Sequence, residues 1–311
     1  MRITQRAVAQ TSLLGLNQNL ERMAKLQQQL TSGRVLNAPS DAPTGTNTSM
    51  QVRQSTAAVT QQARNISDGK GWLDAADTAL NTILTQVRKV RDLTVQGLNT
   101  GSMQGNSATA IATEVRSLRE SLIGLANQSI NGRPVFGGAT QSTQAYDPAT
   151  GAFVGVGGTA TIAGVPTDVT VPLVRRVSDT EAIRIDITGP EAFGDPASGR
   201  DLFALVADIA DHVLTAGADP ADLEADLADL DAAVTRLLTA AADIGARSAR
   251  IATAQQVNTD LQLTLKSRLA DVEEVDLPKT IMELNMQRTG YQAALGATAQ
   301  AIQPNLMDFL R

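Results

Sequence analysis

Residues that could carry out chemistry are scarce in this sequence. It contains no cysteine and one histidine, His212. Without cysteine, disulfides, thiolate nucleophiles and cysteine-ligated metals are excluded. His212 shares a helix face with Asp208 and adjoins Asp211, but metal ligands come in larger clusters. We therefore interpret His212 as a surface or packing residue.

Two further patterns fail as binding sites. The acidic segment from Asp201 to Asp243 holds ten carboxylates and one arginine, but residues 219–231 lack the internal glycine of a calcium loop. We expect a solvated helix face there. No helical pattern follows Gly155-Val156-Gly157-Gly158, as a phosphate loop would require, so we expect a hairpin or loop. The sequence predicts no catalytic residue, no metal and no cofactor.

Charge and hydropathy exclude other classes of protein. The 311 residues carry a net charge of −6, with a pI of about 4.9, which argues against binding to nucleic acid. No apolar run approaches the roughly 18 residues of a membrane span, so we predict no membrane insertion. The polar start, Met1 to Arg6, gives no sign of a secretory signal peptide.

Helical periodicity dominates both ends of the chain. The apolar residues Leu13, Leu16, Leu20, Met23 and Leu30 are separated by three, four or seven positions, which predicts a helix with a narrow contact seam. Residues 32–43 interrupt it with a glycine and two prolines, and Ser40 or Asp41 could cap the next helix. The last helix follows Pro278, with Asp276 as its expected cap. Its seam comprises Leu277, Ile281, Leu284, Tyr291, Leu295 and Ile302.

Longer helices are predicted between these ends. Val52, Val59, Ile66 and Leu73 recur at seven-residue spacing, and similar seams continue to Val90, from Ile111 to Leu125 and from Leu223 to Ile251. Residues 134–199 differ, since they are rich in glycine and threonine and hold half of the aromatic residues. β-prone runs at 152–156, 167–174 and 183–187 predict a β-rich insert there.

The fold class that follows is mainly α. We expect long antiparallel helices forming a coiled-coil rod from both chain ends, with a small β-rich inserted domain. Residues 1–40 and 276–311 would form a terminal coiled-coil assembly domain, residues 41–133 and 200–275 a helical rod domain, and residues 134–199 an outward insert. An isolated amphipathic helix is marginally stable in water. We therefore predict that the two terminal seams are subunit interfaces.

Several motifs resemble those of the flagellin superfamily, and within it most closely the hook-associated protein 3 family of hook–filament junction proteins. They are Met1-Arg2-Ile3-Thr4, Leu30-Thr31-Ser32-Gly33-Arg34, Asn37 to Pro43, Asn131 to Gly138, Ile244-Gly245-Ala246-Arg247 and Tyr291 to Arg311. The resemblance covers nearly the whole chain apart from the interior of the insert.

The resemblance implies a structural role outside the cell. It implies a ring of subunits between hook and filament, with hook-associated protein 1 on one side and flagellin on the other. It also implies export without a cleaved signal peptide, and a chaperone that holds the C-terminal helix. Residues 88–96 resemble a flagellin stretch that innate immune receptors recognise, with Lys89 where flagellins usually carry arginine.

Two alternatives remain from the sequence. The chain could be flagellin itself, the filament subunit, although its end, Asp308-Phe309-Leu310-Arg311, favours a junction protein. More remotely, the insert could host an enzyme or ligand-binding module. Its acidic residues form no short-range motif and it lacks histidine and cysteine, so we predict a protein that is not an enzyme.

Overall fold

The computed structural model describes residues 2–98, 105–140, 142–155, 159–162, 165–168, 172–195, 201–215 and 220–302. Within them the helices are α1 (Arg2–Ser32), α2 (Pro43–Leu98), α3 (Gly105–Ala126), α4 (Gly189–Phe193), α5 (Leu202–Thr215), α6 (Pro220–Glu273) and α7 (Leu277–Ile302). The strands are β1 (Ser129–Ile130), β2 (Arg133–Pro134), β3 (Thr159–Ile162), β4 (Val165–Asp168), β5 (Val174–Arg176) and β6 (Ala182–Arg184). The predicted fold class, mainly α with a small β-containing insert, is confirmed.

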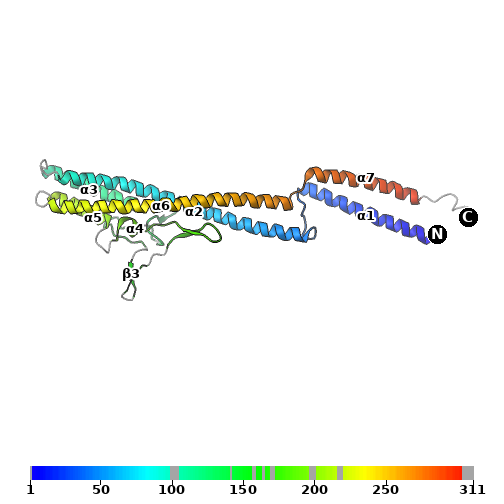
Figure 1. Cartoon of the computed structure of the whole chain (residues 1–311), viewed down its shortest axis with the longest axis horizontal. Helices are drawn as coiled ribbons and strands as arrows, with labels where there is room; N and C mark the ends of the chain where they lie inside the picture. Colours follow the sequence, from blue (N-terminus) through cyan, green and yellow to red (C-terminus); the bar gives the residue numbers. More distant parts are fainter. Residues whose placement is uncertain are drawn as a thin grey trace. The chain divides into compact units, whose positions relative to one another are not determined.

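The chain divides into two compact units, Val59–Thr259 and Met1–Ala58 with Asp260–Arg311. The first unit contains most of the apolar core. There α2 and α6 run antiparallel, because Val59 lies beside Asn258 and Arg91 beside Asp231. Helices α3 and α5 pack alongside them (Figure 1). The heptad residues Ile66 and Leu73 are almost fully buried in this core, as the seam predicted.

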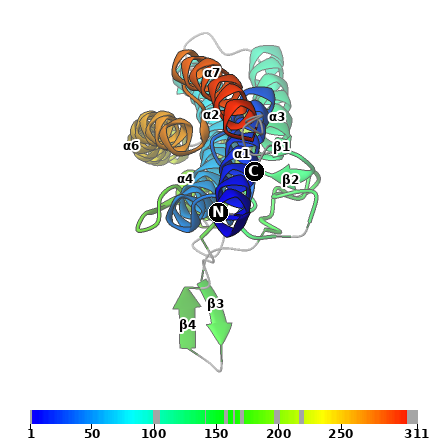
Figure 2. The same ribbon diagram turned by 90° about the vertical axis from the view of Figure 1, so that its right-hand side faces the viewer.

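The second unit contains the two terminal helices. Helices α1 and α7 pack against each other, and Figure 2 shows them side by side almost end-on. Pro278 lies in the first turn of α7, where a proline costs no hydrogen bond. The Asp276 carboxylate accepts the Lys279 N–H at 3.1 Å, so the predicted cap of this helix is confirmed.

Among the described residues, antiparallel hairpins pair β1 with β2 at the entry to the insert, and β3 with β4 and β5 with β6 within it. The β1–β2 turn is Asn131-Gly132, and both residues have positive φ, 51° and 77°. Asn-Gly is the favoured sequence of such a two-residue turn. The β-prone runs predicted at 152–156, 167–174 and 183–187 overlap the observed strands only in part: of the first, Phe153 makes a single bridge to Tyr146.

Aromatic rings fill the core of the insert. The Tyr146 ring is fully buried, with its centroid 4.7 Å from that of Phe203 and 5.3 Å from that of Phe153. The Asn127 side chain accepts the Ala145 and Tyr146 N–H groups, both at 2.8 Å. These two bonds tie residues 145–146 of the insert to the residue that follows the end of α3. In the part of the chain described, no helix has the length and apolarity needed to span a membrane.

Candidate assembly surface

The seam between α1 and α7 is thin and partly polar. Leu16 and Leu284 are buried in it, each with 8% of its surface exposed. Between them along the seam, the Gln287 side-chain amide donates to Asn19 Oδ1 at 2.9 Å. The other apolar side chains described in α1 and α7 are at most half-buried, so this hairpin gains limited stability from its own seam.

Apolar residues that the seam leaves exposed gather on one side of the hairpin. At about 100° per residue, Leu13 and Leu20 are rotated in the same sense from Leu16. Leu277, Ile281 and Leu295 are rotated likewise from Leu284. Because the two helices are antiparallel, equal rotations bring both stripes to the same side. We call these five residues the apolar face; between 40% and 57% of each is exposed.

The structure distributes the predicted interface residues over two surfaces. Leu16 and Leu284 lie in the intrachain seam, and Met23, Leu30 and Tyr291 are half-buried. Leu13, Leu20, Leu277, Ile281 and Leu295 form the apolar face. The side chain of Ile302 lies outside the described residues. Contact of these residues with a neighbouring subunit stays a prediction.

Sequence reasoning missed a third group of exposed apolar residues. Leu14, Met282 and Met286 are 64%, 62% and 66% exposed, and they lie on the helix sides away from the seam. A signal was present, because from Asn285 to Ile302 the sequence has a single charge, Arg288. A solvated helix normally carries charges on its outer side, so most of the surface of α7 is unusually apolar or uncharged.

The two linkers that lead to this hairpin are fixed by charged side chains. Glu273, at the end of α6, is paired with Arg53 of α2 at 2.8 Å, and this hydrogen bond holds the pKa of Glu273 below its usual range. Asp41 is paired with Lys25 of α1 at 3.0 Å, which lowers the Asp41 pKa. The predicted role of Asp41 as a cap of α2 is wrong, since its carboxylate accepts the Asn37 and Ala38 N–H groups of the linker instead.

His212 has a specific partner, but the pair forms no metal site. Its Nδ1 lies 2.6 Å from Asp226 Oδ2, which joins α5 to α6. The hydrogen bond to Asp226 raises the pKa of His212, while burial raises that of Asp226. Within the described ranges, no group of three or more histidines and carboxylates could hold a metal ion.

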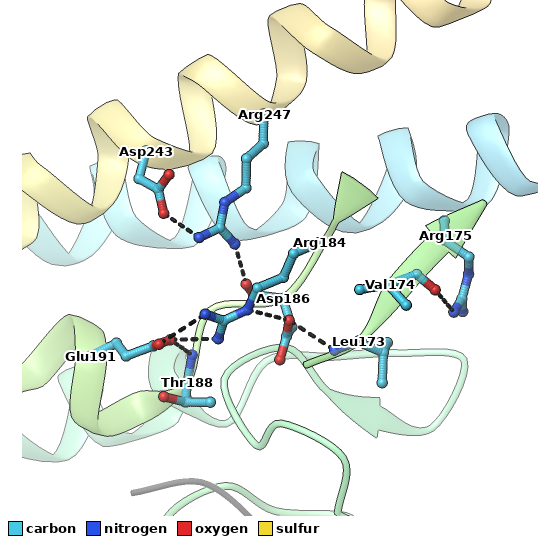
Figure 3. Close-up of polar contacts among 9 residues, drawn as sticks. All are labelled: Leu173, Val174, Arg175, Arg184, Asp186, Thr188, Glu191, Asp243 and Arg247. Carbon is cyan, nitrogen blue, oxygen red and sulfur yellow. Dashed lines mark hydrogen bonds and ion pairs between the residues drawn. The ribbon is translucent and has the colours of Figure 1, made fainter. Parts of the chain in front are cut away.

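Polar contacts anchor the insert to α6 (Figure 3). Arg247, from the Ile244–Arg247 motif, donates to the Asp186 carbonyl at 2.6 Å and pairs with Asp243. The buried Asp186 carboxylate accepts from Arg184 Nε at 2.9 Å. Arg184 also pairs with Glu191 at 2.7 Å. The adjoining depression, of about 390 Å³, is lined by three of these paired groups, so we interpret the network as structural.

Protein-family models match both halves of this architecture. The bacterial flagellin N-terminal helical region matches residues 3–141, and the bacterial flagellin C-terminal helical region matches residues 227–310. The chain belongs to the flagellin family. The matched regions contain the terminal helices, both linkers and most of the long helices. The unmatched stretch contains most of the insert.

Individual relatives support the same assignment of this flagellin-family chain. Flagellar hook-associated protein 3 of Escherichia coli is 25% identical over 96% of both chains. Flagellin of Bacillus subtilis is 26% identical over the full length of both. The crystal structure of the flagellar junction protein of Legionella pneumophila has the same fold, with a TM-score of 0.53 and 13% identity over 73% of this chain and 100% of that one.

Proposed function

We propose that this protein is a structural component of the bacterial flagellum that joins the hook to the filament. The observation that carries the proposal is the terminal hairpin of a flagellin-family chain, with its apolar face exposed on one side. Large exposed apolar patches mark interaction surfaces. The curated relative from Escherichia coli is a hook-associated protein rather than a filament subunit.

The proposed role in assembly follows from the apolar surface that a single chain leaves unburied. Each fully buried leucine or isoleucine contributes about 1.5–3 kcal/mol, and the five residues of the apolar face remain substantially exposed in the single chain. Packing against neighbouring subunits would bury them. The free energy that orders the seams of the two terminal helices, Leu13–Leu30 and Leu277–Ile302, would then come largely from assembly, as in segments that fold on binding. On this proposal, the terminal helices form the assembly domain and the insert lies on the outside.

The partners we propose are copies of this chain in a ring, hook-associated protein 1 on the hook side and flagellin on the filament side. An export chaperone would hold the C-terminal helix before assembly, and the protein would reach the extracellular flagellum without a cleaved signal peptide. The function is mechanical, and we assign no catalytic step to any residue.

Deletion of the gene tests the proposal directly. Electron microscopy of the cells, combined with an immunoassay for flagellin in the medium, should show bare hooks and abundant secreted flagellin. Filament subunits would then be exported without a junction to attach to. Re-expression of the intact chain should restore filaments and serves as the control. Normal filaments after deletion, in cells with no second copy of the gene, would contradict the junction role.

A filament role is the second candidate, because the full-length match to Bacillus subtilis flagellin favours it. The same deletion separates the two roles. Loss of the filament subunit itself would also leave bare hooks, but the medium would contain no flagellin. Measurement of secreted flagellin therefore decides between the junction and the filament.

A further inference from the structure

Two chain segments at opposite ends of the sequence pair with each other in the second unit. The Val35 N–H donates to the Glu273 carbonyl at 2.8 Å, and the Val275 N–H donates to the Gly33 carbonyl at 3.1 Å. Arg34 lies opposite Glu274 in the same antiparallel bridge. We call residues 33–35 and 273–275 the clasp. It joins the linker between α1 and α2 to the linker between α6 and α7.

The C-terminal side of the clasp depends on one buried carboxylate. Glu273 is 6% exposed, and its two oxygens accept from Arg53 Nε and Nη2 at 2.9 and 2.8 Å. The Ser49 hydroxyl donates to the same carboxylate. A buried carboxylate is tolerated only with such partners. The contacts therefore hold Glu273 where its carbonyl meets Val35.

The N-terminal side of the clasp is shaped by contacts of its own. The Asp41 carboxylate accepts the Ala38 N–H at 3.0 Å and the Asn37 N–H at 3.2 Å, and it pairs with Lys25. The Gln29 side-chain amide donates to the Val35 carbonyl at 3.1 Å. Within the described part of the chain, the side-chain contacts of Asp41 are to its own linker and to α1. Asp41 can thus affect residues 273–275 only indirectly, through its own linker or through Lys25 of α1.

We propose that the clasp couples the ordering of the two chain ends, so that each linker is held in place only when the other is also ordered. The coupling is reciprocal, because two segments that stabilise each other must do so equally in both directions. Loss of order in the linker before α7 releases residues 33–38. Loss of order in the linker after α1 releases residues 273–275.

The coupling has a consequence for assembly, which rests on the function proposed above. The clasp needs residues near the beginning and near the end of the chain. A chain delivered from one end cannot fix the linker of its first terminal helix until the second linker has followed. The assembly surface would therefore be completed only when the whole chain is present. The coupling itself can be measured without any assembly.

Amide hydrogen exchange of the full chain tests the coupling. In Asp41→Ala, exchange at the Val275 amide should accelerate about tenfold, the change expected when a hydrogen bond to a charged group is lost upstream. In Glu273→Ala, exchange at the Asn37 and Ala38 amides should accelerate similarly. Lys25→Ala, which removes one contact of Asp41, should give a smaller change at Val275.

Asp231→Ala is the matched control. It removes an ion pair between α2 and α6, as Glu273→Ala does, but at a place remote in sequence from the clasp, and it should leave all clasp amides unchanged. Changes confined to the mutated linker in the two clasp variants would overturn the proposal. So would a Val35 or Val275 amide that exchanges without protection in the unmutated chain. Failure of the junction role would leave the predicted exchange pattern intact.

Discussion

The core of residues 59–259 and the hairpin of α1 and α7 come from the same kind of heptad pattern, but they are buried very differently. Leu73, Ile83 and Leu122 are at most 1% exposed, because α2 is covered by several neighbouring helices. In the hairpin α1 and α7 pack against each other, and Leu16 and Leu284 are the best-buried of their described apolar residues. Periodicity shows that an apolar helix face will pack against another helix. It does not show whether that helix belongs to the same chain or to a neighbouring subunit.

The largest difference between these regions should appear on assembly. Leu20→Asp or Leu295→Asp places a charge on the apolar face, and an unpaired buried charge costs several kcal/mol. Incorporation into flagella should fall roughly 100-fold or more, as measured by immunoblotting of purified flagella. Gln18→Asp, which adds the same charge on the side of α1 away from the apolar face, should incorporate normally. Normal incorporation of both leucine variants would contradict a role of this face in assembly.

Within the core of residues 59–259, the loss of stability on substitution should come mainly from cavity formation. Leu122→Ala should lower the free energy of unfolding by about 2–5 kcal/mol, because Leu122 is fully buried and its removal leaves a void. Urea denaturation followed by circular dichroism measures this change. Leu238→Ala in the same unit, where the side chain is 46% exposed, should cost far less. Equal effects of the two substitutions would show that the core is not closed as described.

At the end of α1, a change in backbone strain should have an effect on stability that is smaller than that of a core cavity. Gly33 has a φ of +68°, and nothing lies within 4 Å of an added Cβ, so Gly33→Ala should cost about 1 kcal/mol through backbone strain alone. Gly15 lies inside α1 with similarly open space, and Gly15→Ala should instead stabilise the helix by up to about 1 kcal/mol. The rate of amide hydrogen exchange in α1 should therefore rise in Gly33→Ala and fall in Gly15→Ala. A change of the same sign in both variants would contradict the predicted strain at Gly33.

The smallest effect should be a pH dependence at His212. The hydrogen bond to Asp226 raises the pKa of His212 above its ordinary value of about 6.5. While Asp226 stays ionised, the protonated histidine therefore contributes fully to stability below about pH 6.5, and this contribution is lost as pH rises through the raised pKa. Because a third of the histidine side chain is exposed, we expect less than about 1 kcal/mol. Denaturation at about pH 5 and pH 9 measures it, and His212→Gln should remove the difference.

Much of the helical part of this fold could be predicted from residue spacing. Val59, Ile66 and Leu73 are buried as their spacing indicates, and Asp276 caps α7. Residue types and spacing predicted the linkers and the insert less well. Asp41 is a plausible cap by residue type, yet Lys25 and the amides of its own linker hold its carboxylate. The short strands of the insert depend on pairing between distant segments, which local β propensity cannot specify.

The positions of the helices, their apolar residues and the lack of any cysteine or histidine cluster for chemistry all follow from the amino-acid sequence. The division of the apolar seam of each terminal helix depends on the tertiary structure. Leu16 and Leu284 are each buried inside the hairpin, whereas Leu13, Leu20 and Leu295 remain exposed. The reason is geometric. The apolar stripe of each helix is a little wider than the surface that one partner helix can contact. The sequence shows a single periodic stripe, and the position of the partner helix determines which of its residues are buried.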